Sequence, residues 1–89
     1  MRRIIQSTRF KRDYKRAMKR GLDSRKLEAV IGLLLADKPL PARCRPHRLS
    51  GAYGGFWECH IEPDWLLVYD VRPDFLELAA TGTHADLFE

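Results

Sequence analysis

The 89-residue sequence holds only two cysteines, and it lacks the long hydrophobic runs that lead a chain into a membrane. Its longest apolar stretch, residues 29–36, is far short of the ~20 residues that a membrane-spanning helix needs. Among residues 2–9 only Ile4 and Ile5 are apolar, so the apolar core of a secretory signal is missing. We therefore expect a cytoplasmic protein with no membrane partner.

The two cysteines, Cys44 and Cys59, are too few for a disulfide framework and form no CxxC pair, so both are expected to be reduced thiols. Zinc is the metal that these residues suggest, because Cys44-x-x-His47 and Cys59-His60 offer four donor side chains. No zinc-finger spacing fits, and neighbours on a strand such as Cys59 and His60 point to opposite faces. We expect no metal, no cofactor and an inert thiol at Cys59.

Negative charge is scarce at the N-terminal end. Residues 1–26 contain eleven Lys or Arg against Asp13 and Asp23, a net charge of +9, whereas residues 27–89 carry −5. A cationic surface of this density suits nucleic acid or an acidic protein partner. The alternative is a solvated basic helix face with no partner.

The length allows one small domain, so we expect a single domain over residues 1–89. The first half predicts a short strand and two helices. Residues 3–7 include the β-branched pair Ile4 and Ile5, which favours a strand. Apolar residues at helical spacing follow on either side of Gly21 and predict the two helices. Ser7 or Thr8 is expected to cap the first helix, and Asp23 or Ser24 the second.

The second half predicts an antiparallel meander. Strand-like segments at 56–61, 65–71 and 75–81 are separated by short turns that contain Pro63 and Pro73. With the opening strand paired into this sheet and both helices packed on one face, the fold class is α+β.

Strand alternation assigns residues to the two faces of this sheet. Trp57, Cys59 and Ile61 are expected to face the helices, which leaves Phe56, Glu58 and His60 on the uncovered face. In the last strand, the residues expected to face the core are Leu76, Leu78 and Ala80, and those expected on the open side are Glu77 and Thr81.

The candidate catalytic residues lie in this second half. Histidine titrates near neutral pH, so the three histidines can move protons in a phosphodiester cleavage, although a lone surface histidine is the commoner case. Asp64 lies in the turn after His60, where it can orient an imidazole or simply form the turn. The candidates are His47, His60, Asp64 and His84.

Aromatic and basic residues near these positions are candidates for RNA contact. Trp65 and Phe88 can stack on nucleobases, or they can anchor the sheet and the C-terminal end. Arg45 and Arg48 flank the loop that contains His47.

Three motifs resemble the YafQ branch of the RelE/ParE toxin superfamily, namely HRLSG at 47–51, HIEPDWLLVY at 60–69 and TGTHADLF at 81–88. The order of one strand, two helices and a meander is similar to that superfamily as well. The resemblance implies a RelE-like fold and a bacterial toxin that cuts mRNA on the translating ribosome. It also implies a cognate antitoxin as partner.

The same resemblance implies that His47, His60, Asp64 and His84 form the active site, with Trp65 and Phe88 beside it. It implies a metal-free reaction in which the RNA 2′-hydroxyl attacks the adjacent phosphate and His84 protonates the leaving 5′-oxygen. His47 and His60 would activate the hydroxyl or stabilise the phosphate, and Asp64 would orient a histidine or assist as base.

Two other functions stay open from the sequence. One is a non-catalytic toxin of the ParE type that binds gyrase, and the other is a plain basic RNA-binding module. Asp86 and Glu89 depart from the expected branch pattern, since they place acid beside His84 and Phe88. Acid there would favour the protonated form of His84 or repel phosphate.

Overall fold

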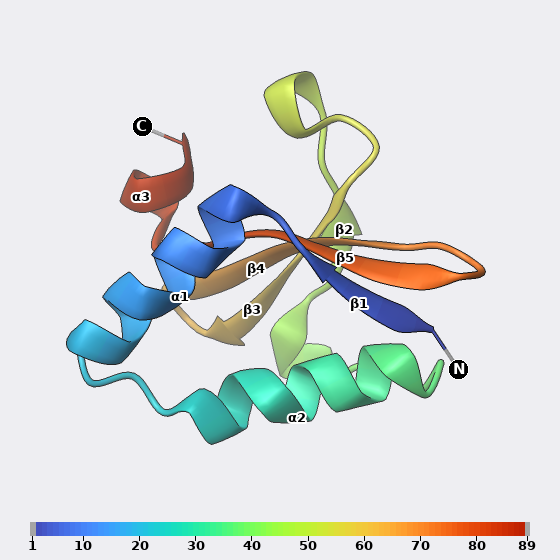
Figure 1. The fold of residues 1–89 in the computed structure, drawn as a ribbon, viewed down its shortest axis with the longest axis horizontal. Coiled ribbons are helices and arrows are strands. Elements are labelled where there is room, and N and C mark those ends of the chain that lie inside the picture. The colour runs from blue at the N-terminus through green and yellow to red at the C-terminus, as the bar shows by residue number, and fades with distance from the viewer. Residues whose placement is uncertain (1, 89) are drawn as a thin grey trace.

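The computed structural model describes residues 2–88, which fold as a mixed sheet with helices on both faces (Figure 1). The strands run in the order β1-β5-β4-β3-β2 across the sheet. In chain order the elements are β1 (Arg3–Gln6), α1 (Thr8–Lys19), α2 (Ser24–Leu35), the 3-10 turn η1 (Ala42–Cys44), β2 (His47–Arg48), the 3-10 turn η2 (Gly51–Tyr53), β3 (Trp57–Glu62), β4 (Trp65–Val71), β5 (Phe75–Gly82) and α3 (His84–Phe88).

The α+β class, the opening strand, the two helices and the β3–β4–β5 meander are confirmed. The expected wholly antiparallel sheet is wrong in one respect, because β1 pairs with β5 in parallel, with Ile4 opposite Leu76. Sequence alternation shows that a strand joins a sheet, but it does not show the direction in which that strand pairs. Four elements were not predicted, namely the two-residue strand β2, the 3-10 turns η1 and η2, and the helix α3.

The two long helices begin at the expected caps. The Ser7 hydroxyl accepts a hydrogen bond from the Phe10 amide at 2.9 Å, and the Asp23 carboxylate accepts one from the Arg25 amide at 3.0 Å. The first helix ends before Gly21, whose φ of +80° suits glycine. These caps fix where α1 and α2 begin and therefore which of their side chains face the sheet.

A core fills the space between these helices and one face of the sheet. It is built from Phe10 and Ala17 of α1, from the apolar face of α2, and from sheet residues that include Cys59 and Ile61. The predicted alternation along β3 is confirmed by this packing. A second, smaller cluster lies on the other face, where Leu66 and Val68 are covered by α3 and by the segment 49–56.

A β-bulge changes the alternation in β5. The pairing with β4 runs Val68 to Ala80 and then Tyr69 to Leu78, so the residue between them is left without a partner. Ala80 is buried in the second cluster rather than beneath the helices. Thr81 is not on the open side as expected, since its side chain is fully buried towards α1 and bonds to Trp65. One extra residue therefore reverses both assignments.

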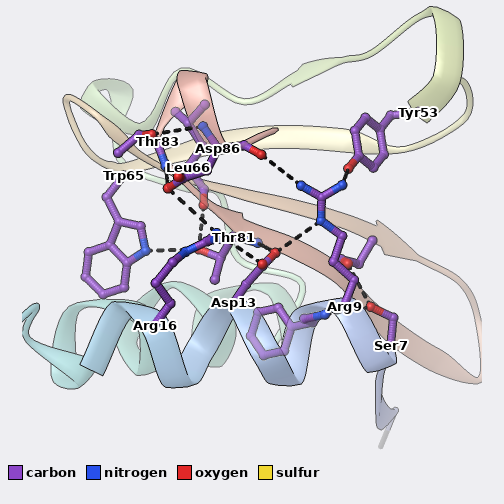
Figure 2. Close-up of polar contacts among 12 residues, drawn as sticks. Ser7, Arg9, Asp13, Arg16, Tyr53, Trp65, Leu66, Thr81, Thr83 and Asp86 are labelled. Atoms are coloured by element: carbon purple, nitrogen blue, oxygen red, sulfur yellow. Dashed lines mark hydrogen bonds and ion pairs between the residues drawn. The ribbon is translucent and has the colours of Figure 1, made fainter. Parts of the chain in front are cut away.

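Hydrogen bonds from α1 stabilise this bulge. The Ser7 hydroxyl donates to the carbonyl of the bulged residue Ala79 at 2.7 Å, and the buried carboxylate of Asp13 accepts from the Thr81 amide at 3.1 Å. Figure 2 shows Ser7, the N-cap of α1, and Asp13 within that helix, both facing the strand that leads to α3. Among residues 2–88, the helices are too short or too polar for any of them to cross a membrane.

Candidate active site

A cleft of about 490 Å³ lies on the sheet face opposite α1 and α2, and it contains all three histidines. His47 comes from β2, His60 from β3 and His84 from the start of α3. The lining residues are Arg45, His47, Leu49, Glu58, His60, His84 and Phe88. The prediction that His60 leaves the helix-covered face is confirmed by this placement.

A buried glutamate joins two of the histidines. Glu58 is only 3% exposed, and its Oε1 lies 3.1 Å from His47 Nε2 and 3.8 Å from His60 Nε2. The pairing of β2 with β3 places His47 opposite Glu58, and alternation along β3 places Glu58 and His60 on the same face. A carboxylate only accepts hydrogen bonds, so His47 donates through Nε2. The carboxylate thus orients the imidazole and stabilises positive charge on either ring.

Glu58 is the functional candidate that the sequence analysis missed. The alternation of β3 already placed it on the face of His60, which was the available signal. Without β2, however, nothing indicated that His47 would pair with it. A buried carboxylate between two histidines is costly to form unless it is hydrogen-bonded, as it is here.

The backbone fixes the proton position on His60. Its Nδ1 lies 3.2 Å from the carbonyl oxygen of Pro63, which is an acceptor only, so Nδ1 carries the hydrogen. The neutral ring then presents the lone pair of Nε2, and Glu58 stands 3.8 Å away to stabilise a proton received there. This tautomer suits a general base.

His84 faces His60 across the cleft, with the two ring centroids 6.0 Å apart. Asp64 contacts His84 twice, since its Oδ1 accepts a hydrogen bond from the His84 amide at 3.1 Å and lies 3.6 Å from the ring Nδ1. The second contact holds Nδ1 towards the carboxylate and leaves Nε2 for another partner. The structure therefore brings His47, His60 and His84 around one cleft, and Asp64 contacts His84 from outside that lining.

The aromatic candidates separate into one exposed and one buried ring. Phe88 is 44% exposed, lies 5.9 Å from the His84 ring and meets Tyr53 edge to face. Trp65 is 2% exposed, and its indole nitrogen donates to the Thr81 hydroxyl at 2.9 Å. Of the two alternatives for Trp65, burial therefore favours the sheet anchor over base stacking, whereas Phe88 is accessible to a base.

The two arginine candidates differ in whether they face the histidine cleft. Arg45 lines the cleft beside His47. Arg48 lies opposite Trp57 in the β2–β3 pairing, and its guanidinium carbon stands 5.5 Å from the centre of that ring. Trp57 packs against the core beneath the helices, so Arg48 is directed away from the histidine cleft.

Helix α3, which carries His84 and Phe88, is anchored to α1 by Asp86 (Figure 2). The Asp86 carboxylate accepts two hydrogen bonds from Arg20, at 2.6 and 3.2 Å, and lies 3.7 Å from Arg16. It also accepts from the Thr83 amide at 2.9 Å, while the Thr83 hydroxyl accepts from the Asp86 amide at 3.1 Å. This reciprocal pair is a capping box at the start of α3. We call these contacts the Asp86 anchor.

The expectation that Asp86 adds acid beside His84 is wrong. Its carboxylate turns towards α1, and the hydrogen bond from Arg20, with that from the Thr83 amide, holds the pKa of Asp86 far below its usual range. Arg9 adds to the anchor by donating to the Asp86 carbonyl at 3.0 Å and to the Tyr53 hydroxyl. Glu89, the other acid expected there, lies outside the described residues.

Part of the positive charge of the basic N-terminal third is neutralised within the molecule. Arg2, Arg9, Arg16 and Arg20 all pair with carboxylates of the same chain. Within residues 2–88, the exposed cations of α1 that form no ion pair are Lys11, Arg12, Lys15 and Lys19. The surface available to an external polyanion is therefore smaller than the +9 charge of the sequence suggested.

Cys59 is buried in the core, as expected, and burial raises the pKa of its thiol to about 12. Such a thiol is not a nucleophile at neutral pH. No three His, Cys, Asp or Glu side chains in the described part of the chain are grouped so that they could share a metal ion. The chemistry that the cleft can perform with its own side chains is proton transfer and anion stabilisation.

A small α+β protein with a cationic surface and a cleft of paired histidines and carboxylates has the features of a nuclease that works by acid–base catalysis. The sequence matches over residues 2–89 the family YafQ_toxin, described as the bacterial toxin of type II toxin–antitoxin systems, YafQ. The chain belongs to this family.

Individual relatives cover nearly the whole chain. The mRNA interferase toxin YafQ of Escherichia coli strain K12 is 41% identical over 86 residues, which are 96% of this chain and 94% of the relative. The toxin in the crystal structure of the E. coli DinJ-YafQ toxin-antitoxin complex is 40% identical, with a TM-score of 0.90 and coverage of 99% and 98%. A metal-bound toxin from Helicobacter pylori is 38% identical, with a TM-score of 0.92 and coverage of 99% and 100%.

Proposed function

We propose that this chain is an mRNA interferase, the toxin of a type II toxin–antitoxin pair, and that it cuts messages on the ribosome. The observation that carries the proposal is the cleft in which the His47–Glu58–His60 cluster faces the Asp64–His84 pair. Family membership and the 41% identity to an E. coli mRNA interferase support the same activity. The β-α-α-β-β-β-β-α order also supports a place in the RelE/ParE superfamily.

The proposed reaction is attack of an RNA 2′-hydroxyl on the adjacent phosphate. His60 takes the hydroxyl proton on Nε2, where Glu58 stabilises the resulting charge, and His47 and Arg45 stabilise the phosphate. The P–O bond to the 5′-oxygen breaks, and His84 delivers a proton to that oxygen while Asp64 holds its other ring nitrogen. The products are a 2′,3′-cyclic phosphate and a 5′-hydroxyl, so no water is consumed in this step.

We further propose that this reaction needs no metal ion, since the histidines and carboxylates of the cleft supply both acid and base. The assay measures cleavage by the purified chain on ribosomes that keep their own Mg²⁺. A chelator selective for transition metals is then added, and the rate is measured again. An unchanged rate is expected. A rate that falls with the chelator and returns with added Zn²⁺ or Cu²⁺ would contradict the metal-free mechanism.

A cognate antitoxin is the proposed protein partner, because an E. coli relative is found in such a complex. The exposed cations of α1 favour an acidic segment on that partner. A small neighbouring reading frame should encode a chain that co-purifies with this one. We also take residues 1–89 to be one toxin domain, which the family match over residues 2–89 supports.

The test of the nuclease proposal is primer extension on a translated message, with the wild type compared with His84→Ala and with Glu28→Ala. Glu28 is exposed on α2, far from the cleft, and serves as the matched control. Cuts in register with codons are expected for the wild type and the control and not for His84→Ala. Cuts that persist in His84→Ala refute its proposed role, and growth arrest with intact messages and inhibited gyrase supports the ParE-type alternative.

A further inference from the structure

A second cavity, of about 420 Å³, adjoins the histidine cleft on the side of α2. Arg45 and His60 line both cavities, so the two meet at these side chains. The other residues that line it are Lys26, Arg43, Ile61, Glu62 and Pro63. An RNA chain whose scissile phosphate lies in the histidine cleft can extend directly into this second cavity.

The turn that presents Arg43 and Arg45 is held rigidly. Cys44 between them is 2% exposed in the core, and its amide donates to the Pro41 carbonyl at 2.9 Å. Arg45 has φ of +42°, in the left-handed region that side-chain-bearing residues rarely adopt. Such backbone persists where the surroundings enforce it, and it is concentrated at binding and catalytic sites. Both guanidinium groups therefore project from a fixed support.

The charge of this cavity is not neutralised within the molecule. Within residues 2–88, neither Arg43 nor Arg45 forms an ion pair or a side-chain hydrogen bond, in contrast to the arginines of the Asp86 anchor. Lys26 pairs with Glu62 at 2.8 Å, but both side chains are partly exposed, so this pair is easily exchanged for another partner. Three cations thus surround the cavity against one carboxylate.

We propose that this cavity is a phosphate subsite for single-stranded RNA. Arg43 contacts the RNA in this subsite and not in the histidine cleft, whereas Arg45 is shared by both. The guanidinium group binds phosphate oxygens through paired donors, which suits a backbone contact that is independent of base sequence. The inference rests on the proposed nuclease function and adds the residues that hold the substrate beyond the cut. Lys26 contributes a third, weaker contact.

The test measures binding rather than cleavage. Labelled 2′-O-methyl oligouridylates, a dimer and a hexamer, lack the attacking hydroxyl, and their affinities are measured by fluorescence anisotropy over a series of salt concentrations. The variants are Arg43→Gln and Arg45→Gln. Lys38→Gln is the control, since it removes one exposed positive charge beyond the opposite end of α2 from Lys26.

Arg43→Gln is expected to weaken hexamer binding about two- to fivefold and to lower the salt slope by about 0.7, with dimer binding unchanged. Arg45→Gln should weaken both probes, and Lys38→Gln neither. Equal affinity and slope for Arg43→Gln and the wild type would overturn the subsite, while loss of cleavage in His84→Ala would still support the nuclease. A folded wild type that binds neither probe would also overturn the subsite, while codon-register cuts by the same protein on a translated message would still support the nuclease.

Discussion

Replacing Asp86 with alanine tests how α3, and with it His84, is held in place. The substitution removes the capping contact to Thr83, worth about 1 kcal/mol. It also removes the ion pair with Arg20 and Arg16, worth up to about 1 kcal/mol because both arginines are about two-fifths exposed. Together these predict a loss of about 2 kcal/mol in the free energy of unfolding. For a domain of this size, that lowers Tm by roughly 8–16 °C.

The same substitution should affect catalysis beyond its effect on stability. Because α3 has only five residues, with Leu87 as its buried residue, loss of the anchor allows His84 and Phe88 to move relative to His60. A displacement of about 1 Å at a catalytic group can cost up to ~100-fold in rate, so we expect kcat to fall at least about tenfold below the melting transition. KM should change less than kcat.

The assays are thermal unfolding by circular dichroism and cleavage kinetics well below Tm, with Glu28→Ala as the matched loss of a carboxylate from an exposed helix position. If Asp86→Ala melts with the wild type and cuts at the wild-type rate, the Asp86 anchor is not what positions α3. If it melts earlier with an unchanged kcat, the anchor stabilises the fold alone, and its positioning role is wrong.

Three further predictions concern neighbouring residues. Gly82→Ala should lower the free energy of unfolding by about 1–3 kcal/mol in urea titrations, because φ at Gly82 is +155° and a Cβ there would lie 2.8 Å from an Asp86 carboxylate oxygen. The pKa of Asp86 is lowered by folding, so its contribution to stability is full above the unfolded pKa of about 3.9 and is lost as pH falls further. Stability measured from pH 6 towards pH 2 should therefore decline more steeply for the wild type than for Asp86→Asn, and parallel curves would contradict this. Glu58→Gln should lower kcat about tenfold or more and alter the pH–rate profile with little change in KM, and an unchanged profile would show that the carboxylate does not act through the histidines.

The elements that sequence reasoning predicted well are those in which hydrophobic period and capping agree. Helices α1 and α2 begin at the expected caps, and the alternation of β3 correctly separates Cys59 from His60. Local propensity and tertiary burial point the same way in these segments, so the pattern is sufficient.

The features that were missed depend on long-range contacts. The strand β2 has two residues and exists because it pairs with β3, and the bulge in β5 is stabilised by Ser7 and Asp13 from another element. The short helix α3 is anchored by Arg16 of α1 and by Arg20, the C-cap residue of that helix. No local pattern reports such contacts, which is why Glu58 was overlooked and Thr81 was assigned to the wrong face.

The parallel pairing of β1 with β5 has a consequence for the order in which the molecule is completed. Residues 3–6 leave the ribosome first, but their partners are residues 75–78, and His84 follows later still. During synthesis, β1 and α1 have neither their partner strand nor the carboxylate of Asp86, and the cleft lacks one wall. The histidine cleft therefore lacks the wall that carries His84 until α3 has been synthesised.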